Sequence, residues 1–149
     1  MKFLVSKHIN MTTKIKIVKG TGGTETDYFF HRLLAMYERW AMKNGCTSLI
    51  NEDTITIIGE SSDSLTQEHG VHRFCFISPY DPQGRRHTVF AKVLVNTFED
   101  NLSWTNDRVR NYMMHPLQLV RNTKTDKKVS GFDMVEHVFD GNPDILWDK

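Results

Sequence analysis

The feature that most constrains the fold is a change in the spacing of apolar residues near the start of the chain. Residues 13–19 alternate lysine with isoleucine or valine, which is the two-residue period of a strand with one buried face. After the glycine-rich residues 20–23, apolar side chains recur every three or four residues from Phe29 to Trp40. The sequence therefore predicts a strand, a glycine turn and a long amphipathic helix over residues 24–44.

The rest of the chain favours strands with one further helix. Segments rich in β-branched and aromatic residues, bounded by turn-forming residues, predict strands at residues 54–58, 71–77, 88–95 and 109–114. A short amphipathic helix is predicted at residues 133–139. We therefore predict an α+β fold class, in which an antiparallel β-sheet packs on a long helix and a small α/β extension follows at the C-terminal end.

Length and composition limit the number of domains and the expected cellular location. A chain of 149 residues suits one domain with a modest core. No apolar run approaches the roughly 20 residues of a membrane-spanning helix, and the opening residues MKFLVSKHIN lack the apolar stretch of a secretory signal. We therefore expect a cytoplasmic protein without membrane contact, in which the only two cysteines, Cys46 and Cys75, are reduced.

The net charge of +1 conceals basic clusters. Residues 1–23 contain five lysines and no acid, and further basic clusters lie at residues 85–87 and 121–128. Clustered cations are the electrostatic signature of nucleic-acid binding. On charge alone, ordinary solvated surface remains the simpler interpretation.

The residues give no sign of a metal site, a cofactor site or a catalytic centre. His69, His72 and Cys75 are spaced three residues apart, so on a strand they point to alternating faces and do not converge on a metal. Cys75 lies in an aromatic strand, where a buried, inert thiol is the simpler interpretation. Residues 20–23 lack the lysine of a nucleotide-binding loop, so they offer only backbone N–H donors at a helix N-terminus.

Three segments together resemble a known family. GTGGTETDYFFHRLLAMYERWAMKNG (20–45), HGVHRFCFISPYDPQGRRHTVF (69–90) and LSWTNDRVRNYMMHPLQLVRNTKTDKK (102–128) resemble, in order, successive parts of bacterial class I peptide-chain release factors. The tripeptide Ser78-Pro79-Tyr80 resembles the Ser-Pro-Phe of the branch that reads UAA and UGA, and residues 84–88 are similar to that branch's Gly-Arg-Arg-His-Thr. The resemblance implies the fold of the release-factor decoding superdomain.

The resemblance also implies a domain organisation. Residues 1–11 form a basic N-terminal extension, 12–95 a stop-codon-recognition domain, 96–104 a short linker and switch loop, and 105–149 the C-terminal part of the same superdomain. Release factors hydrolyse peptidyl-tRNA through a Gly-Gly-Gln motif on a domain inserted before the switch loop, and no Gly-Gly-Gln occurs in this sequence. The eight residues between Val95 and Trp104 span at most about 28 Å. We therefore expect no enzyme activity, and expect the family's N-terminal helical domain to be missing too.

By resemblance, stop-codon binding falls to Gly22, Gly23, Glu25, Ser78, Pro79, Tyr80, Arg85, Arg86, His87 and Thr88. Backbone donors at the helix tip would meet the first-position uracil, and the Ser78 hydroxyl would satisfy adenine or guanine at the second position. His87 offers a ring for stacking and Thr88 a hydroxyl for the third base, while the two arginines would offset phosphate charge. Trp104 resembles the switch-loop tryptophan that packs against rRNA in the decoding centre.

Each of these residues also has a plain structural interpretation, as a turn, a strand end or a surface side chain. The expected function is a non-catalytic release-factor-like protein that binds the ribosomal A site at UAA or UGA, with the ribosome and the mRNA stop codon as partners, and competes with or modulates termination. One alternative is an adaptor that recruits an additional protein, such as a hydrolase or rescue factor. Others are an A-site nuclease that uses His72, His87, Arg85 or Arg86, and a fold repurposed for another partner.

Overall fold

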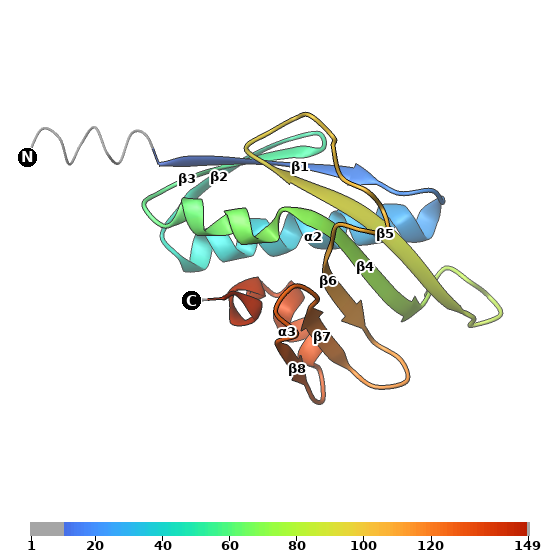
Figure 1. Cartoon of the computed structure of the whole chain (residues 1–149). Helices are drawn as coiled ribbons and strands as arrows, with labels where there is room; N and C mark the ends of the chain where they lie inside the picture. The colour runs from blue at the N-terminus through green and yellow to red at the C-terminus, as the bar shows by residue number, and fades with distance from the viewer. Residues whose placement is uncertain (1–10, 149) are drawn as a thin grey trace, which may run out of the picture.

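The computed structural model describes residues 11–148, and it contains a single eight-stranded sheet with a long helix across one face (Figure 1). The basic extension predicted at residues 1–11 lies outside the described residues, apart from Met11. The elements are β1 (Thr12–Lys19), α2 (Thr24–Lys43), β2 (Thr47–Asn51), β3 (Thr54–Ile58), the 3-10 helix η1 (Ser62–Glu68), β4 (Gly70–Ile77), β5 (Arg86–Val95), β6 (Arg108–Met113), β7 (Leu119–Asn122), β8 (Lys128–Ser130), α3 (Met134–Phe139) and the 3-10 helix η2 (Pro143–Leu146).

The strand order is β2-β3-β1-β5-β4-β6-β7-β8. All neighbouring strands are antiparallel except β4 and β6, which run parallel. The loop at residues 96–107 carries the chain from the end of β5 past β4, so β6 starts at the same end of the sheet as β4 and runs in its direction. The predicted α+β fold class is confirmed, with this one parallel pair as its departure from a fully antiparallel sheet.

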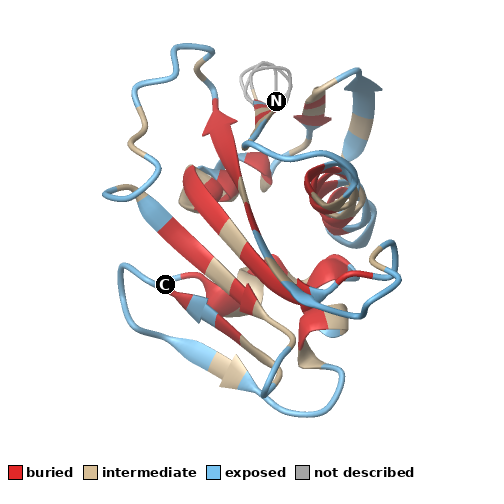
Figure 2. Cartoon of the chain, turned by 90° about the vertical axis from the view of Figure 1, so that its right-hand side faces the viewer, coloured by how far each residue is buried: buried red, intermediate tan, exposed pale blue. Residues whose placement is uncertain are grey.

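Helix α2 forms the core together with the sheet. The apolar positions whose spacing predicted it are at most 2% exposed: Phe29, Leu33, Met36 and Trp40. Phe29 packs against Phe74 of β4 with 5.1 Å between ring centroids, and Phe139 of α3 stacks on Tyr112 of β6 at 4.8 Å. Burial is greatest in the central strands and least in the edge strands β2 and β8 (Figure 2). The two aromatic pairs therefore join the helices to the middle of the sheet.

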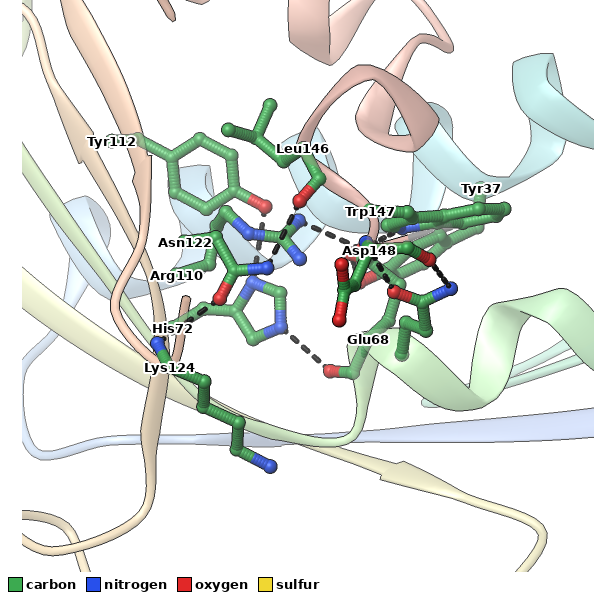
Figure 3. Close-up of polar contacts among 11 residues, drawn as sticks. Tyr37, Glu68, His72, Arg110, Tyr112, Asn122, Lys124, Leu146, Trp147 and Asp148 are labelled. Carbon is green, nitrogen blue, oxygen red and sulfur yellow. Dashed lines mark hydrogen bonds and ion pairs between the residues drawn. The ribbon is translucent and has the colours of Figure 1, made fainter. Parts of the chain in front are cut away.

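A buried polar network joins the helix, the sheet and the C-terminal segment (Figure 3). The Glu68 carboxylate is fully buried and accepts hydrogen bonds from Tyr37 Oη at 2.9 Å, Arg110 Nη1 at 2.7 Å and Trp147 Nε1 at 2.7 Å. Burial is the largest influence on the pKa of Glu68 and acts to raise it, but the adjacent Arg110 guanidinium and His72, together with the hydrogen bonds from Trp147 and Arg110, outweigh burial, so the pKa is lowered. His72 lies 3.0 Å from Tyr112 Oη and 2.8 Å from the Glu68 carbonyl, and its burial lowers its pKa to about 4. Glu68 is therefore ionised and His72 neutral at pH 7.

No helix within residues 11–148 is long and apolar enough to span a membrane. Nor does this part of the chain bring three or more His, Cys, Asp or Glu side chains together in a way that suits a metal ion. His72, one of the residues weighed for a metal site, instead belongs to the network around Glu68.

Candidate nucleic-acid interface

The predicted site residues gather at one end of the sheet, on the right in Figure 1, where the β1–α2 turn and the β4–β5 loop lie close together. The Gly20 amide donates a hydrogen bond to the Phe90 carbonyl at 2.9 Å, which fixes the turn beside the middle of β5. The Ser78 hydroxyl donates to Glu25 Oε2 at 2.8 Å, a contact between residues 53 positions apart in the sequence. The β1–α2 turn and the β4–β5 loop, which are far apart in the sequence, thus form one surface.

The tip of α2 requires glycine at one of its two positions. Gly22 has φ +144°, and a Cβ there would lie 2.4 Å from Thr26 Oγ1. At Gly23 φ is negative, at −117°, and a Cβ would have no neighbour within 4 Å among the described residues. No side chain of the described part of the chain caps the helix N-terminus, so the N–H groups of the first turn are left without a side-chain acceptor there. This is a suitable place for an external hydrogen-bond acceptor.

Ser78 is only 2% exposed, and its hydroxyl is already engaged. Besides donating to Glu25, the Ser78 oxygen accepts a hydrogen bond from the Tyr80 amide at 3.1 Å. The sequence predicts a role for Glu25 through its backbone N–H only. The structure adds its carboxylate, so a hydroxyl donor and an anionic acceptor lie side by side at this point of the surface.

Asp81 organises the loop that carries the remaining residues. Its carboxylate accepts hydrogen bonds from Arg85 Nε at 2.9 Å, His87 Nε2 at 2.8 Å and the backbone N–H of Gln83 at 2.9 Å. The hydrogen bonds from Arg85 and His87 hold the pKa of Asp81 well below its usual range. In the sequence, Asp81 is one of the turn-forming residues between two predicted strands, and its Asx-turn bond to Gln83 is the one local signal of a larger role.

The other residues of the site are accessible. Pro79, Arg86 and Thr88 are exposed, and Arg85 is exposed while paired with Asp81. Tyr80 is 56% exposed and contacts Tyr28 edge to face, with 5.8 Å between the ring centroids. The hydroxyl that distinguishes Tyr80 from the family's phenylalanine therefore needs no buried partner.

Trp104 lies on the helix-free side of the sheet. The Lys92 ammonium is 4.3 Å from the centroid of the Trp104 ring and 3.0 Å from Asp100 Oδ2. Trp104 and Asp100 therefore hold the Lys92 ammonium in place. Trp104 also lines a hollow of about 360 Å³ whose other residues include Gly20 and Thr88. The structure thus brings Trp104 next to the predicted reader of the third base.

Comparisons with known proteins agree with this geometry. The profile of the PCRF domain matches residues 2–93, which is more than half of the chain. The chain belongs to the class I peptide-chain release factor family. Curated relatives favour the branch that the tripeptide predicted. Peptide chain release factor 2 of Phenylobacterium zucineum is 38% identical over 101 residues, and that of Petrotoga mobilis is 42% identical over 96 residues.

The match is partial in extent. The aligned residues make up 59% and 56% of this chain but only 27% and 26% of those two relatives, so the chain spans about a quarter of their length. Among solved structures, RF2 of Thermus thermophilus superposes with a TM-score of 0.74 at 20% identity, over 94% of this chain and 67% of that one. This superposition confirms the predicted decoding-superdomain fold.

Proposed function

We propose that this release-factor-like chain binds the ribosomal A site over UAA or UGA and competes with or modulates termination without hydrolysing peptidyl-tRNA. The observation that carries the proposal is the assembly of the tip of α2, Ser78 and the Asp81 loop at one end of the sheet. Single-stranded RNA is read by contacts to the exposed edges of unstacked bases, and this end offers donors, acceptors and rings for such contacts. Such a module acts in the cytoplasm, where it meets ribosomes.

The first base would be read by backbone. The N–H groups at Gly22, Gly23 and Glu25 suit the carbonyl acceptors of uracil, and the open space at Gly23 lets a base approach the backbone. Cytosine presents an amino donor on the same edge, which these donors would repel. This arrangement favours a codon that begins with uracil.

The second base would be read by the pair formed by Ser78 and Glu25. The amino group of adenine donates a hydrogen bond, which the Glu25 carboxylate accepts. The O6 of guanine accepts one, and the Ser78 hydroxyl supplies it by turning away from Glu25. The pair therefore admits both UAA and UGA, because it holds one group of each polarity.

The remaining residues would hold the third base and the backbone. The imidazole of His87 is fixed by Asp81, so it offers a pre-oriented ring for stacking, and Thr88 offers a hydroxyl beside it. Arg86 is free to contact phosphate, whereas Arg85 shares its charge with Asp81. Trp104 is placed to contact rRNA beside the third base.

The proposal that the chain does not hydrolyse peptidyl-tRNA rests on the segment that connects β5 to β6. Only 12 residues connect β5 to β6, where the family inserts its hydrolytic domain, and no Gly-Gly-Gln occurs in the sequence. Without a group that reaches the peptidyl-tRNA ester, occupation of the A site would block the authentic release factor and delay termination.

Equilibrium binding to ribosomes with UGA, UAA, UAG or a sense codon in the A site tests the proposal, with peptide release followed in the same tubes. We expect tighter binding to UGA and UAA, no release, and loss of the preference in Ser78→Ala. The matched control is Ser48→Ala on the edge strand β2, far along the sheet from the site. Equal binding to all four codons, or release of peptide, would refute the proposal.

One observation favours an adaptor as a second candidate. Leu117 and Phe132 are 73% and 93% exposed and border a hollow of about 520 Å³ between the β6–β7 loop and the segment after β8. Exposed apolar groups that line a hollow are typical of a protein-docking site. In this case Leu117→Ser with Phe132→Ser would leave codon preference intact and remove a partner that otherwise co-purifies with the stalled ribosome in fixed proportion. A chain that binds ribosomes without such a partner contradicts the adaptor.

A further inference from the structure

The strands of this protein carry positive charge and no negative charge. The eight strands within residues 11–148 contain ten lysines and arginines, whereas all 18 aspartates and glutamates lie outside them. A sheet with one face against a helix and the other toward solvent usually carries both signs on its polar face. Whether these cations form one basic surface therefore depends on the face of the sheet to which they point.

The register places several of them in one line across the sheet. Opposite residues on neighbouring strands share a face, and the pairing runs Phe90, Arg73, Asn111, Arg121, Lys128 across β5, β4, β6, β7 and β8. We call these five residues the basic row. Neighbouring strands are about 4.8 Å apart, so the row extends for about 19 Å.

The adjacent line of residues identifies the face. It runs Val89, Phe74, Tyr112, Val120, Val129, and these residues belong to or pack on the hydrophobic core. Consecutive residues of a strand point to opposite faces. The basic row therefore lies on the face of the sheet that α2 does not cover.

Little within the described residues neutralises the row. Arg121 pairs with Asp126, but Arg73 donates to the neutral Asn111 Oδ1 at 3.0 Å, and Lys128 is exposed without a carboxylate partner between residues 11 and 148. Next to the row, the Arg108 guanidinium lies 5.2 Å from the centroid of the Phe90 ring. The surface thus combines uncompensated cations with an aromatic ring.

We propose that the basic row binds the phosphate backbone of RNA, as a second surface. It adjoins the codon-reading end at Phe90, which lines the same hollow as Thr88 and Trp104, and extends away from that end across the sheet. Arg73, Arg121 and Lys128 suit phosphate oxygens, and a row of about 19 Å meets several phosphates of one strand. These contacts carry no sequence information, so the surface binds RNA whether or not a stop codon is present. This inference goes beyond the proposed function and does not depend on it.

The test is binding of a fluorescein-labelled, 20-nucleotide single-stranded RNA without stop triplets, measured by fluorescence anisotropy over a range of salt concentrations. The variant is Arg121→Gln with Lys128→Gln, both exposed. The matched control is Arg39→Gln with Lys43→Gln on α2, which removes the same charge from exposed side chains and also breaks one ion pair. Circular dichroism melts establish that both variants fold.

We expect the row variant to bind at least fivefold more weakly and its salt slope to fall by about 1.4, since each phosphate contact on a single strand contributes about 0.7. The control is expected to stay within twofold of the parent chain. Equal losses in both variants, or no loss in either, would overturn the proposal. Weaker binding to poly-glutamate with RNA binding unchanged would also overturn it, in favour of an acidic protein partner. Ser78→Ala is expected to have no effect in this assay, which keeps the proposal separate from codon reading.

Discussion

Replacement of Glu68 by glutamine tests how far the buried network stabilises this fold. The substitution keeps the shape of the side chain and removes its charge. Arg110 then remains fully buried beside a neutral amide, and its Nε and Nη2 atoms already lack hydrogen-bond partners among residues 11–148. Tyr37, Arg110 and Trp147 now all donate hydrogen bonds to the two carboxylate oxygens of Glu68. The single amide oxygen of glutamine can accept fewer hydrogen bonds than these two oxygens accept.

The magnitude follows from the burial of both partners. Loss of one member of a buried ion pair costs about 3–5 kcal/mol, because the other charge stays desolvated and unpaired. For a domain of this size, each kcal/mol lowers the melting temperature by about 2–4 °C, so we expect a drop of roughly 6–20 °C. Urea unfolding of the parent and the variant gives the free energy of unfolding directly.

The chain offers a matched control in Glu136→Gln. Glu136 pairs with Arg32, but its side chain is 46% exposed, and solvent screening limits such a pair to about 0.2–1 kcal/mol. A second variant, Glu68→Gln with Arg110→Met, is expected to recover part of the loss because it removes the unpaired charge. If Glu68→Gln costs less than about 1 kcal/mol, or no more than Glu136→Gln, the buried charge does not dominate the network and the reasoning is wrong.

Three other predictions concern the site and the pH response. Asp81→Asn is expected to weaken UGA-dependent ribosome binding about tenfold, since the loop loses the carboxylate that receives three hydrogen bonds; unchanged affinity would contradict this. Gly22→Ala is expected to cost about 1–3 kcal/mol in urea unfolding because of its φ of +144°, whereas Gly23→Ala, with open space around its Cβ, is expected to cost less stability and to weaken codon binding. Equal effects of the two alanines on stability would count against this account of the helix tip. His72 has its pKa lowered by burial to about 4, so its contribution to stability is present above pH 6.5 and is lost as the pH falls toward 4, at a cost of about 3 kcal/mol. Urea midpoints between pH 7 and pH 4 measure this loss, and an equally steep loss in His72→Gln would assign it to other groups.

Local patterns in the sequence were sufficient for most of the fold. The helical spacing from Phe29 to Trp40 predicted α2, and the alternation in residues 13–19 predicted β1, because each reports the burial of one face of a single element. The strands β2, β7 and β8 were missed. They are three to five residues long and lie at or near the edges of the sheet, where few side chains are buried and the alternation is weak.

The parts of the site that escaped prediction depend on contacts between distant residues. Nothing local indicates that Glu25 meets Ser78, since 53 positions separate them and only the packing of α2 on the sheet brings them together. The ion pair between Glu68 and Arg110 is equally non-local, at 42 positions. The basic row is invisible in the sequence for a further reason. It exists only through the register of five strands, and a shift of one residue would move a strand's side chains to the other face.

The two proposed surfaces are expected to make different contributions to ribosome binding, and these contributions can be measured separately. Codon preference is assigned to the loop end around Ser78, and salt-dependent affinity to the basic row. Within residues 11–148, Ser78 at the end of β4 and Lys128 on the edge strand β8 share no partner, and three strand spacings separate β4 from β8. Distant sites without shared partners contribute additively to within about 0.3–0.5 kcal/mol. Ser78→Ala and the double change Arg121→Gln with Lys128→Gln are therefore expected to combine additively on UGA-programmed ribosomes, the first lowering only the preference over a sense codon and the second lowering affinity for all codons alike. A coupling well above that range would mean that the sheet face and the codon loop bind as one unit, and the separation argued from the register would fail.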